Sequence, residues 1–203
     1  MDSKYQHIIF DFDYTLFDTS EGMALCYKEA LTAIGVQYDD NQLDIYVKES
    51  LKMTYNRFKT TESFERFENV FLKTSEKYMC KLSKIYPETY QIVGQLYKKG
   101  KKISIVTGKP RVRVVEILKK YNMDCFFTKI VGYGDYSESK PNPESLNICI
   151  TEVGVKKENC VYVGDSLYDV EAASNAGIKG VLIDRSKKTK NAIEGLSQIM
   201  ELL

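Results

Sequence analysis

Five short apolar runs, separated by segments with helical periodicity, constrain the fold of this chain most strongly. The first run is IIF at residues 8–10, and the later ones read KISIVTG, FFTKIVG, CVYVGD and GVLID. Short runs rich in β-branched residues are typical of buried strands. Their alternation with helices favours a parallel sheet covered on both faces. The sequence therefore predicts an α/β fold with five parallel core strands and helices on both faces of the sheet.

The segments between these runs carry recognisable helix signals. Pro87 suits a first turn, the apolar residues that follow it form one face, and Gly100 ends the pattern. By the same kind of signal we expect further helices, over residues 111–121, 143–153, 168–176 and 189–202.

The segment from about residue 20 to residue 83 interrupts this alternation. It is rich in Tyr, Phe, Lys and Glu, it contains no convincing strand, and we expect helices only. Aromatic residues at helical spacing are expected to form the core of a small bundle: Phe64, Phe67 and Phe71. The prediction is a core domain of residues 1–18 and 84–203 with an all-helical cap domain, 19–83, inserted after the first strand. An insert there would lie over the carboxyl end of the sheet, where open α/β folds bind ligands.

Composition excludes several classes of function. The 29 Lys and Arg residues balance 28 Asp and Glu residues, so no overall field favours nucleic acid or an anionic membrane. No basic leader and no apolar run near the length of a membrane span is present, and the five scattered cysteines lack a C-x-x-C pair. We therefore expect a cytoplasmic protein with reduced thiols. The single histidine, His7, is expected to be structural.

Polar residues gather where the strands are expected to end. They are Asp11 and Asp13 after the first run, Thr107 and Gly108 after the second, and Asp165 and Asp169 after the fourth. Lys140 precedes a helix start and can point to the same edge. Carboxylates on one rim repel each other unless a cation lies between them, and an all-oxygen set suits Mg²⁺. A hydroxyl, an amide and an ammonium suit phosphoryl oxygens, so the set suggests phosphoryl transfer through an aspartyl-phosphate.

Four motifs in order resemble the haloacid dehalogenase superfamily of phosphohydrolases. They are DFDYT after the first strand, a threonine ending the next core strand in IVTG, KPNP, and GDSLYD. The position of the helical insert and the KPNP form resemble the phosphoglycolate phosphatase and beta-phosphoglucomutase branch. The resemblance implies a Rossmann-like core with a small helical cap.

The resemblance also implies roles for individual residues. Asp11 would be the nucleophile, and Asp13 would protonate the leaving oxygen and later activate water. Mg²⁺ would be held by Asp11, the backbone carbonyl of Asp13, and Asp165, with Asp169 as a direct ligand or a partner of one. Thr107, Gly108 and Lys140 would bind the substrate's phosphoryl group, with Thr107 and Lys140 counted as catalytic.

The roles of two further sets of residues stay open at this point. Lys109, Arg111 and Arg113 follow Thr107 and either steer anions or form a solvated helix face. In the insert, four residues are candidates for substrate specificity, although each alone would suit a surface position: Lys48, Ser50, Lys52 and Arg57. Thr15 is expected to fix its loop through its hydroxyl.

The preferred function is a Mg²⁺-dependent phosphatase of a small phosphorylated metabolite. The candidates are a phosphoglycolate-like acid, a sugar phosphate and a nucleoside monophosphate. A phosphomutase of the same fold and a non-catalytic regulatory protein are the alternatives. We expect no nucleic-acid or membrane partner, and a monomer or weak homodimer.

Overall fold

The computed structural model describes residues 4–47 and 49–202 of the chain. Two compact units form it, one of Met1–Asp18 with Ile85–Leu203 and one of Thr19–Lys84. We call them the sheet unit and the helical unit and describe each by itself. Where the chain passes between them, strands β2 (Phe17–Asp18) and β3 (Lys84–Ile85) form a two-stranded sheet.

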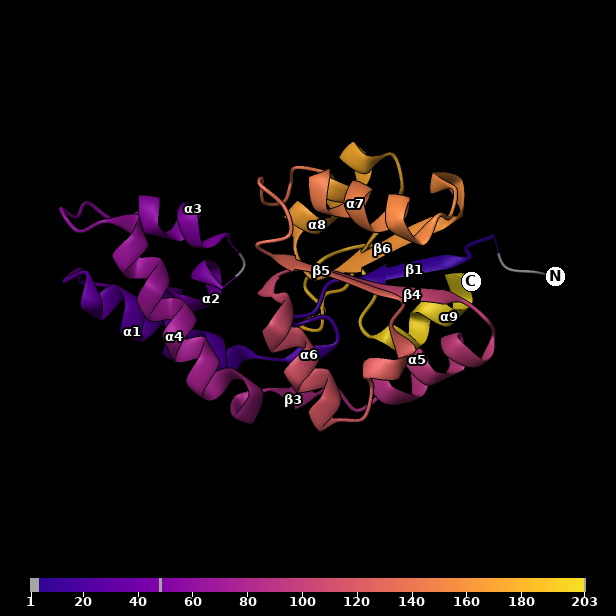
Figure 1. The fold of residues 1–203 in the computed structure, drawn as a ribbon, viewed down its shortest axis with the longest axis horizontal. Coiled ribbons are helices and arrows are strands. Elements are labelled where there is room, and N and C mark those ends of the chain that lie inside the picture. The colour runs from indigo at the N-terminus through magenta and orange to yellow at the C-terminus, as the bar shows by residue number, and fades with distance from the viewer. Residues whose placement is uncertain (1–3, 48, 203) are drawn as a thin grey trace. The chain divides into compact units, whose positions relative to one another are not determined.

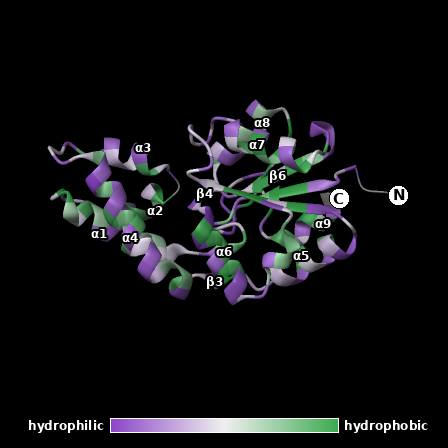
Figure 2. Cartoon of the chain, viewed as in Figure 1, coloured by the Kyte–Doolittle hydropathy of each residue, from purple (hydrophilic) through white to green (hydrophobic). Residues whose placement is uncertain are grey.

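The sheet unit is built on five parallel strands in the order β5-β4-β1-β6-β7 (Figure 1). They are β1 (His7–Phe10), β4 (Lys102–Pro110), β5 (Lys129–Tyr133), β6 (Cys160–Gly164) and β7 (Lys179–Leu182). β1 lies in the middle, and all of its residues are buried, as expected of a strand covered on both faces. Figure 2 shows the hydrophobic residues concentrated in these strands. The predicted five-stranded parallel sheet is confirmed.

Helices cover both faces of this sheet. They are α5 (Thr89–Lys98), α6 (Arg111–Lys120), α7 (Glu144–Val153), α8 (Leu167–Ala176) and α9 (Ile199–Leu202), with short 3₁₀ turns at Asp124–Phe126, Lys157–Asn159 and Leu196–Gln198. In Figure 1, α7 and α8 lie on one face, and α5, α6 and α9 lie on the other. The α/β fold class with helices on both faces is confirmed.

The prediction of a long helix over residues 189–202 was wrong. Only the 3₁₀ turn Leu196–Gln198 and α9 form there, because the backbone before them makes other hydrogen bonds. The Asp184 carboxylate accepts hydrogen bonds from the backbone N–H groups of residues 186, 188 and 189, which makes a tight loop. Ile193 then forms an extended bridge with Ile183 beyond the end of β7. These contacts hold the first part of the segment in a non-helical conformation despite the helical spacing of its apolar residues.

The helical unit consists of α1 (Ser20–Ala33), a 3₁₀ turn (Asp40–Gln42), α2 (Leu43–Tyr46), α3 (Leu51–Asn56) and α4 (Phe64–Leu82). α1 packs along α4, and Tyr27 contacts the buried rings of Phe67 and Phe71. The prediction of helices with an aromatic core is confirmed for this segment. Within the described part of the chain, no helix of either unit is long and apolar enough to cross a membrane.

Candidate active site

The candidate site lies at the carboxyl edge of the sheet, where three adjacent strands end together. β4, β1 and β6 are neighbours and run parallel, so the residues that follow them emerge at one edge. Asp11 follows β1 directly, Thr107 lies near the end of β4, and Asp165 follows β6. The Asp11 N–H donates to the Val163 carbonyl at 2.8 Å, which ties the first loop to β6.

Lys140 joins two carboxylates at this edge. Its Nζ lies 2.8 Å from Oδ1 of Asp11 and 2.6 Å from Oδ1 of Asp169. The same ammonium donates to the Tyr162 hydroxyl at 3.0 Å. The Lys140 side chain is 14% exposed, and those of Asp11 and Asp169 are 7% and 2% exposed. The structure therefore brings three of the predicted residues together in a largely buried ion cluster.

The loop that carries Lys140 is held by the start of α7. Oε2 of Glu144 accepts hydrogen bonds from the backbone N–H groups of Ser137 at 3.0 Å and Glu138 at 2.8 Å. The Asn142 side-chain oxygen accepts from the Glu144 N–H at 2.9 Å. Lys140 lies between these anchors in the sequence, so the helix start fixes the backbone that presents its side chain.

Burial and neighbouring charges shift the pKa of each ion in this cluster. Burial raises the pKa of Asp11 to about 7, while Lys140 acts in the opposite direction. Burial also opposes ionisation of Asp169, but Lys140 and hydrogen bonds from Ser166 lower its pKa below the usual value. The pKa of Lys140 is raised well above its usual value, since Asp11 and Asp169 outweigh burial. Asp11 is thus a buried carboxyl group whose ionised form a further cation would stabilise.

Asp13 has a cationic partner of its own. Oδ1 of Asp13 lies 3.0 Å from Nζ of Lys109, whose side chain is 2% exposed. Lys109 therefore belongs to the site and not to a solvated helix face. Arg111, by contrast, is 60% exposed and faces Asp135, and Arg113 pairs with Glu116 on its own helix.

The turn that follows Asp13 is held from the far end of the chain. Tyr14 has φ of 58°, a left-handed conformation that is costly for a residue with a side chain. The Arg185 guanidinium donates to the Tyr14 carbonyl at 3.2 Å and to the Thr15 carbonyl at 2.8 Å, and it pairs with Glu88 at 2.7 Å. The buried Thr15 hydroxyl has no hydrogen-bond partner among the described residues. Arg185, and not the Thr15 hydroxyl, therefore fixes this turn.

Thr107 and Gly108 lie where β4 leaves its regular register. The pairing of β4 with β5 shifts between Val106 and Pro110. The Thr107 hydroxyl accepts from the Lys109 N–H at 3.2 Å, and the Thr107 carbonyl accepts from the Tyr136 hydroxyl at 3.2 Å. Thr107 is buried, whereas Gly108 is exposed. The irregular strand end therefore presents the Gly108 backbone at the surface.

Asp165 and Asp169 occupy different positions after β6. Asp165 follows the strand and is half-buried, while Asp169 lies buried in the first turn of α8. Oδ2 of Asp169 accepts hydrogen bonds from the Ser166 N–H at 2.9 Å and its hydroxyl at 2.7 Å. A Cβ atom at Gly164 would lie 2.4 Å from Cγ of Asp169. Only glycine at position 164 therefore leaves room for Asp169 in this orientation.

The oxygen atoms at this edge have the chemistry that Mg²⁺ prefers. Over residues 4–47 and 49–202, however, no three His, Cys, Asp or Glu side chains are grouped as metal ligands. An ion at this edge would take its ligands from these carboxylates together with the backbone, the substrate or water. The raised pKa of Asp11 fits such a site, because a cation would stabilise its ionised form.

The predicted specificity residues of the insert lie in the helical unit. Lys52 stands over the Phe64 ring at 4.2 Å, and the Arg57 guanidinium forms two hydrogen bonds to Glu49. Ser50 accepts from the Met53 N–H and so caps α3. Lys48 lies outside the described residues. Lys52 and Arg57 are both exposed.

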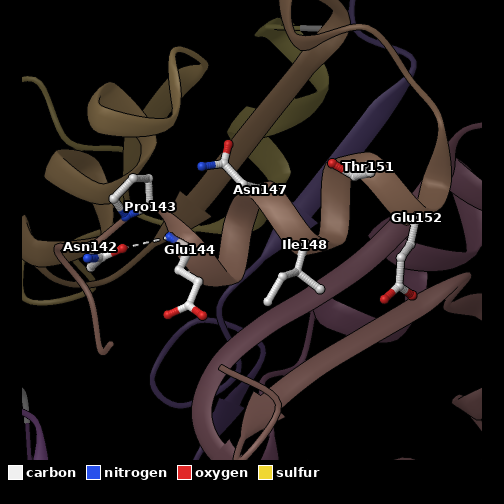
Figure 3. A pocket seen from close by; sticks show the side chains of 7 residues that line it. All are labelled: Asn142, Pro143, Glu144, Asn147, Ile148, Thr151 and Glu152. Atoms are coloured by element: carbon white, nitrogen blue, oxygen red, sulfur yellow. Dashed lines mark hydrogen bonds between the residues drawn. The ribbon is translucent and has the colours of Figure 1, made fainter. Parts of the chain in front are cut away.

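A surface pocket of about 580 Å³ lies along α7 and is separate from these residues. Figure 3 shows its lining side chains, which run from Asn142 to Glu152 along the helix. None of the predicted site residues lines it. The chemistry at the strand ends and this pocket are therefore different features of the molecule.

Two residues of the site were missed by sequence reasoning. Tyr162 carries a hydroxyl inside an otherwise apolar, fully buried strand, and that contrast is a usable signal. Arg185 lies 171 residues from Tyr14 in the sequence and matches no motif, so only the fold reveals it.

The model of one family, described as haloacid dehalogenase-like hydrolase, matches residues 8–183 of the chain. A pyrophosphatase PpaX of Halalkalibacterium halodurans is 30% identical over 177 residues, which cover 87% of this chain and 82% of the relative. A phosphoglycolate phosphatase of Photorhabdus laumondii is 30% identical over 185 residues, covering 84% and 76%. The crystal structure of a protein from Bacteroides fragilis assigned to haloacid dehalogenase-like hydrolases has a TM-score of 0.89 at 27% identity. It covers 96% of this chain and 99% of its own.

Proposed function

Because the chain belongs to the haloacid dehalogenase-like hydrolase family, we propose that it is a Mg²⁺-dependent phosphatase of small phosphorylated metabolites. The observation that carries this proposal is the Lys140 ammonium held between Asp11 and Asp169. A buried carboxylate beside a buried ammonium supplies a nucleophile and a group that binds phosphoryl oxygens. The relatives' names support two substrate classes, a phosphoglycolate-like acid and the anhydride pyrophosphate. Sugar phosphates and nucleoside monophosphates remain candidates.

The proposed reaction has two steps. In the first, an Asp11 oxygen attacks phosphorus, the bond to the leaving oxygen breaks, and Asp13 gives that oxygen a proton. In the second, Asp13 takes a proton from water, which attacks phosphorus, releases phosphate and restores Asp11. Lys140 holds Asp11 in position throughout. Its contact with Asp11 at 2.8 Å supports this role.

Asp13 needs a defined position to exchange protons in both steps. The Lys109 ammonium at 3.0 Å restrains its carboxylate, and Arg185 restrains the backbone that follows it. We propose that Thr107 and the Gly108 N–H, with Lys140, bind the phosphoryl oxygens. The exposed backbone of Gly108 supports this, because nothing in the described chain lies within 4 Å of a Cβ built at that position.

We propose that Mg²⁺ would be held by the carboxylates of Asp11 and Asp165 and by the backbone carbonyl of Asp13. This set combines two side-chain carboxylates with a backbone carbonyl, all of them oxygen ligands of the kind that Mg²⁺ prefers. The oxygens of Asp169 already accept hydrogen bonds from Lys140 and Ser166, so we place Asp169 beside Lys140 and not on the ion. When bound, the ion would neutralise charge between the nucleophile and the phosphoryl oxygens.

We further propose that residues 19–83 act as a cap that selects the substrate. The short β2 and β3 connections at its two ends support this, since hinges are usually a few residues at element ends. Replacing Lys52 with Met or Arg57 with Ala is expected to lower kcat/KM for the true substrate more than for a small aryl phosphate. Arg66→Ala is the matched control, because Arg66 is also an exposed partner of a glutamate within this unit. Equal losses for both substrates would refute the cap's selective role.

The activity itself is tested with purified protein, Mg²⁺ and an aryl phosphate, followed by a panel of phosphorylated metabolites that includes phosphoglycolate and pyrophosphate. We expect turnover that a chelator abolishes and added Mg²⁺ restores, and that Lys140→Met removes. Absence of turnover with every compound would refute the proposal. Light scattering on the same preparation tests the prediction of a monomer or weak homodimer.

A further inference from the structure

Tyr162 is the one hydroxyl-bearing side chain in β6, a strand otherwise made of Cys, Val and Gly residues. It is 0% exposed and packs in the cluster that the central sheet forms with α7 and α8. A phenol at such a place is costly unless its hydroxyl is hydrogen-bonded. The hydrogen-bond partners of its hydroxyl therefore indicate the role of Tyr162.

The first partner is the Lys140 ammonium, which has three protons to donate. Three acceptors surround it: Oδ1 of Asp11 at 2.8 Å, Oδ1 of Asp169 at 2.6 Å and the Tyr162 hydroxyl at 3.0 Å. Each proton thus has one acceptor. If the tyrosine acceptor were lost, one donor of a largely buried cation would have no partner.

The second partner lies on the strand that carries Thr107. In the sheet, β1 separates β6 from β4, and Tyr162 lies opposite Ile9 of β1 (Figure 1). The side chain nevertheless reaches the Val106 carbonyl, 2.8 Å from its hydroxyl, and also lies 3.0 Å from Oδ1 of Asp169. Val106 is the last residue of β4 in regular register with β5 before the strand shifts. The hydroxyl therefore joins β6, the end of β4 and the Lys140 loop at one point.

We propose that Tyr162 is a positioning residue that holds the Lys140 ammonium in a fixed place relative to Asp11 and Thr107. The inference rests on the proposed phosphatase function and adds to it a residue that no motif of the chain contains. Tyr162 touches neither the phosphoryl group nor the leaving group. It acts through Lys140, whose ammonium donates to Asp11 and whose positive charge would attract the phosphoryl oxygens.

The test is Tyr162→Phe in the full chain, which keeps the ring and removes the hydroxyl. We expect kcat to fall by about tenfold or more, the effect of losing a hydrogen bond to a charged group, while KM changes by less than about threefold. Ser104→Ala is the matched control. It removes a buried hydroxyl from β4 that bonds His7 at 2.8 Å, two residues before Val106. We expect this control to lower the thermal stability and leave kcat unchanged.

A second measurement does not depend on activity or on the folding of the Phe variant. 3-Fluorotyrosine at position 162 keeps the hydroxyl, and its ¹⁹F resonance reports on the contacts of the ring. Lys140→Met should shift this resonance, whereas Lys102→Met, an exposed residue at the opposite end of β4, should not. Equal small shifts in the two variants would overturn the inference.

The outcomes separate the two proposals. If the wild-type protein hydrolyses no phosphorylated compound, the proposed function fails. If the wild-type protein turns over and Tyr162→Phe keeps its kcat while losing stability, the function stands and the inference about Tyr162 is overturned.

Discussion

The single histidine makes the stability of this chain depend on pH in a way that can be isolated. His7 opens the central strand β1, is 0% exposed, and shares a hydrogen bond of 2.8 Å with Ser104 on β4. Burial, with a contribution from Lys102, lowers its pKa from 6.5 to about 4. The folded protein thus binds a proton at this site less readily than the unfolded chain does.

The sign and size of the effect follow from this difference. Above pH 6.5 the imidazole is neutral in both states, and its contribution to stability is fully present. As pH falls from 6.5 to about 4 the unfolded chain takes up the proton first, so stability is lost across that window. The full difference corresponds to about 3 kcal/mol in the free energy of unfolding.

The assay compares wild type with His7→Asn by urea unfolding at several pH values. The chain has no Trp and 15 Tyr, so tyrosine fluorescence and far-UV circular dichroism are the probes. The carboxylates titrate in both proteins, so their contribution cancels in the difference between the two free energies of unfolding. We expect the stability advantage of wild type to shrink by about 3 kcal/mol between pH 7 and pH 4. Parallel curves, or an imidazole NMR resonance that titrates near 6.5 in the folded protein, would contradict the lowered pKa of His7.

Further predictions concern the site. Lys109→Met should lower kcat more for an alkyl phosphate than for an aryl phosphate, because Asp13 would lose a partner that positions it and the alkyl leaving group depends on the proton from Asp13. Steady-state kinetics with both esters measure the difference. Equal losses of kcat for the two esters would argue against this role of Lys109. Gly164→Ala should abolish turnover and lower the melting temperature, since its Cβ would collide with Asp169. Gly94→Ala, in a helix with nothing within 4 Å of the added Cβ, should instead raise stability by up to about 1 kcal/mol; thermal unfolding of the two variants decides.

The sheet could be predicted because its signals are local. Short β-branched runs followed by polar residues indicate where parallel strands end. Neighbouring parallel strands place those ends at one edge of the sheet, and this does not depend on the conformation of the connecting loops. This is why Asp11 and Asp169 could be expected near each other. Lys140 was within reach of the same reasoning because KPNP marks a helix start.

The rest depends on contacts between distant residues. The helical pattern over residues 189–202 gave way to a loop organised by Asp184, a competition that periodicity does not register. Lys109 lies in a basic stretch that is typical of an exposed segment. The irregular end of β4 buries its side chain against Asp13, and the sequence pattern does not indicate this. The support of the Tyr14 turn by Arg185 joins opposite ends of the chain. Sequence patterns thus predict where reactive groups emerge, and the fold decides which side chains hold them.

Trapping the covalent intermediate tests the role of Asp11 most directly. The enzyme is mixed with an aryl phosphate and Mg²⁺, quenched in acid within its turnover time, digested and analysed by mass spectrometry. We expect a phosphoryl group on Asp11 in wild type. We also expect this adduct to accumulate in Asp13→Asn, where attack on an acidic leaving group continues but water is not activated, and no adduct to form in Asp11→Asn. Phosphoryl label on another residue, or sustained turnover by Asp11→Asn, would contradict the assignment of Asp11 as the nucleophile.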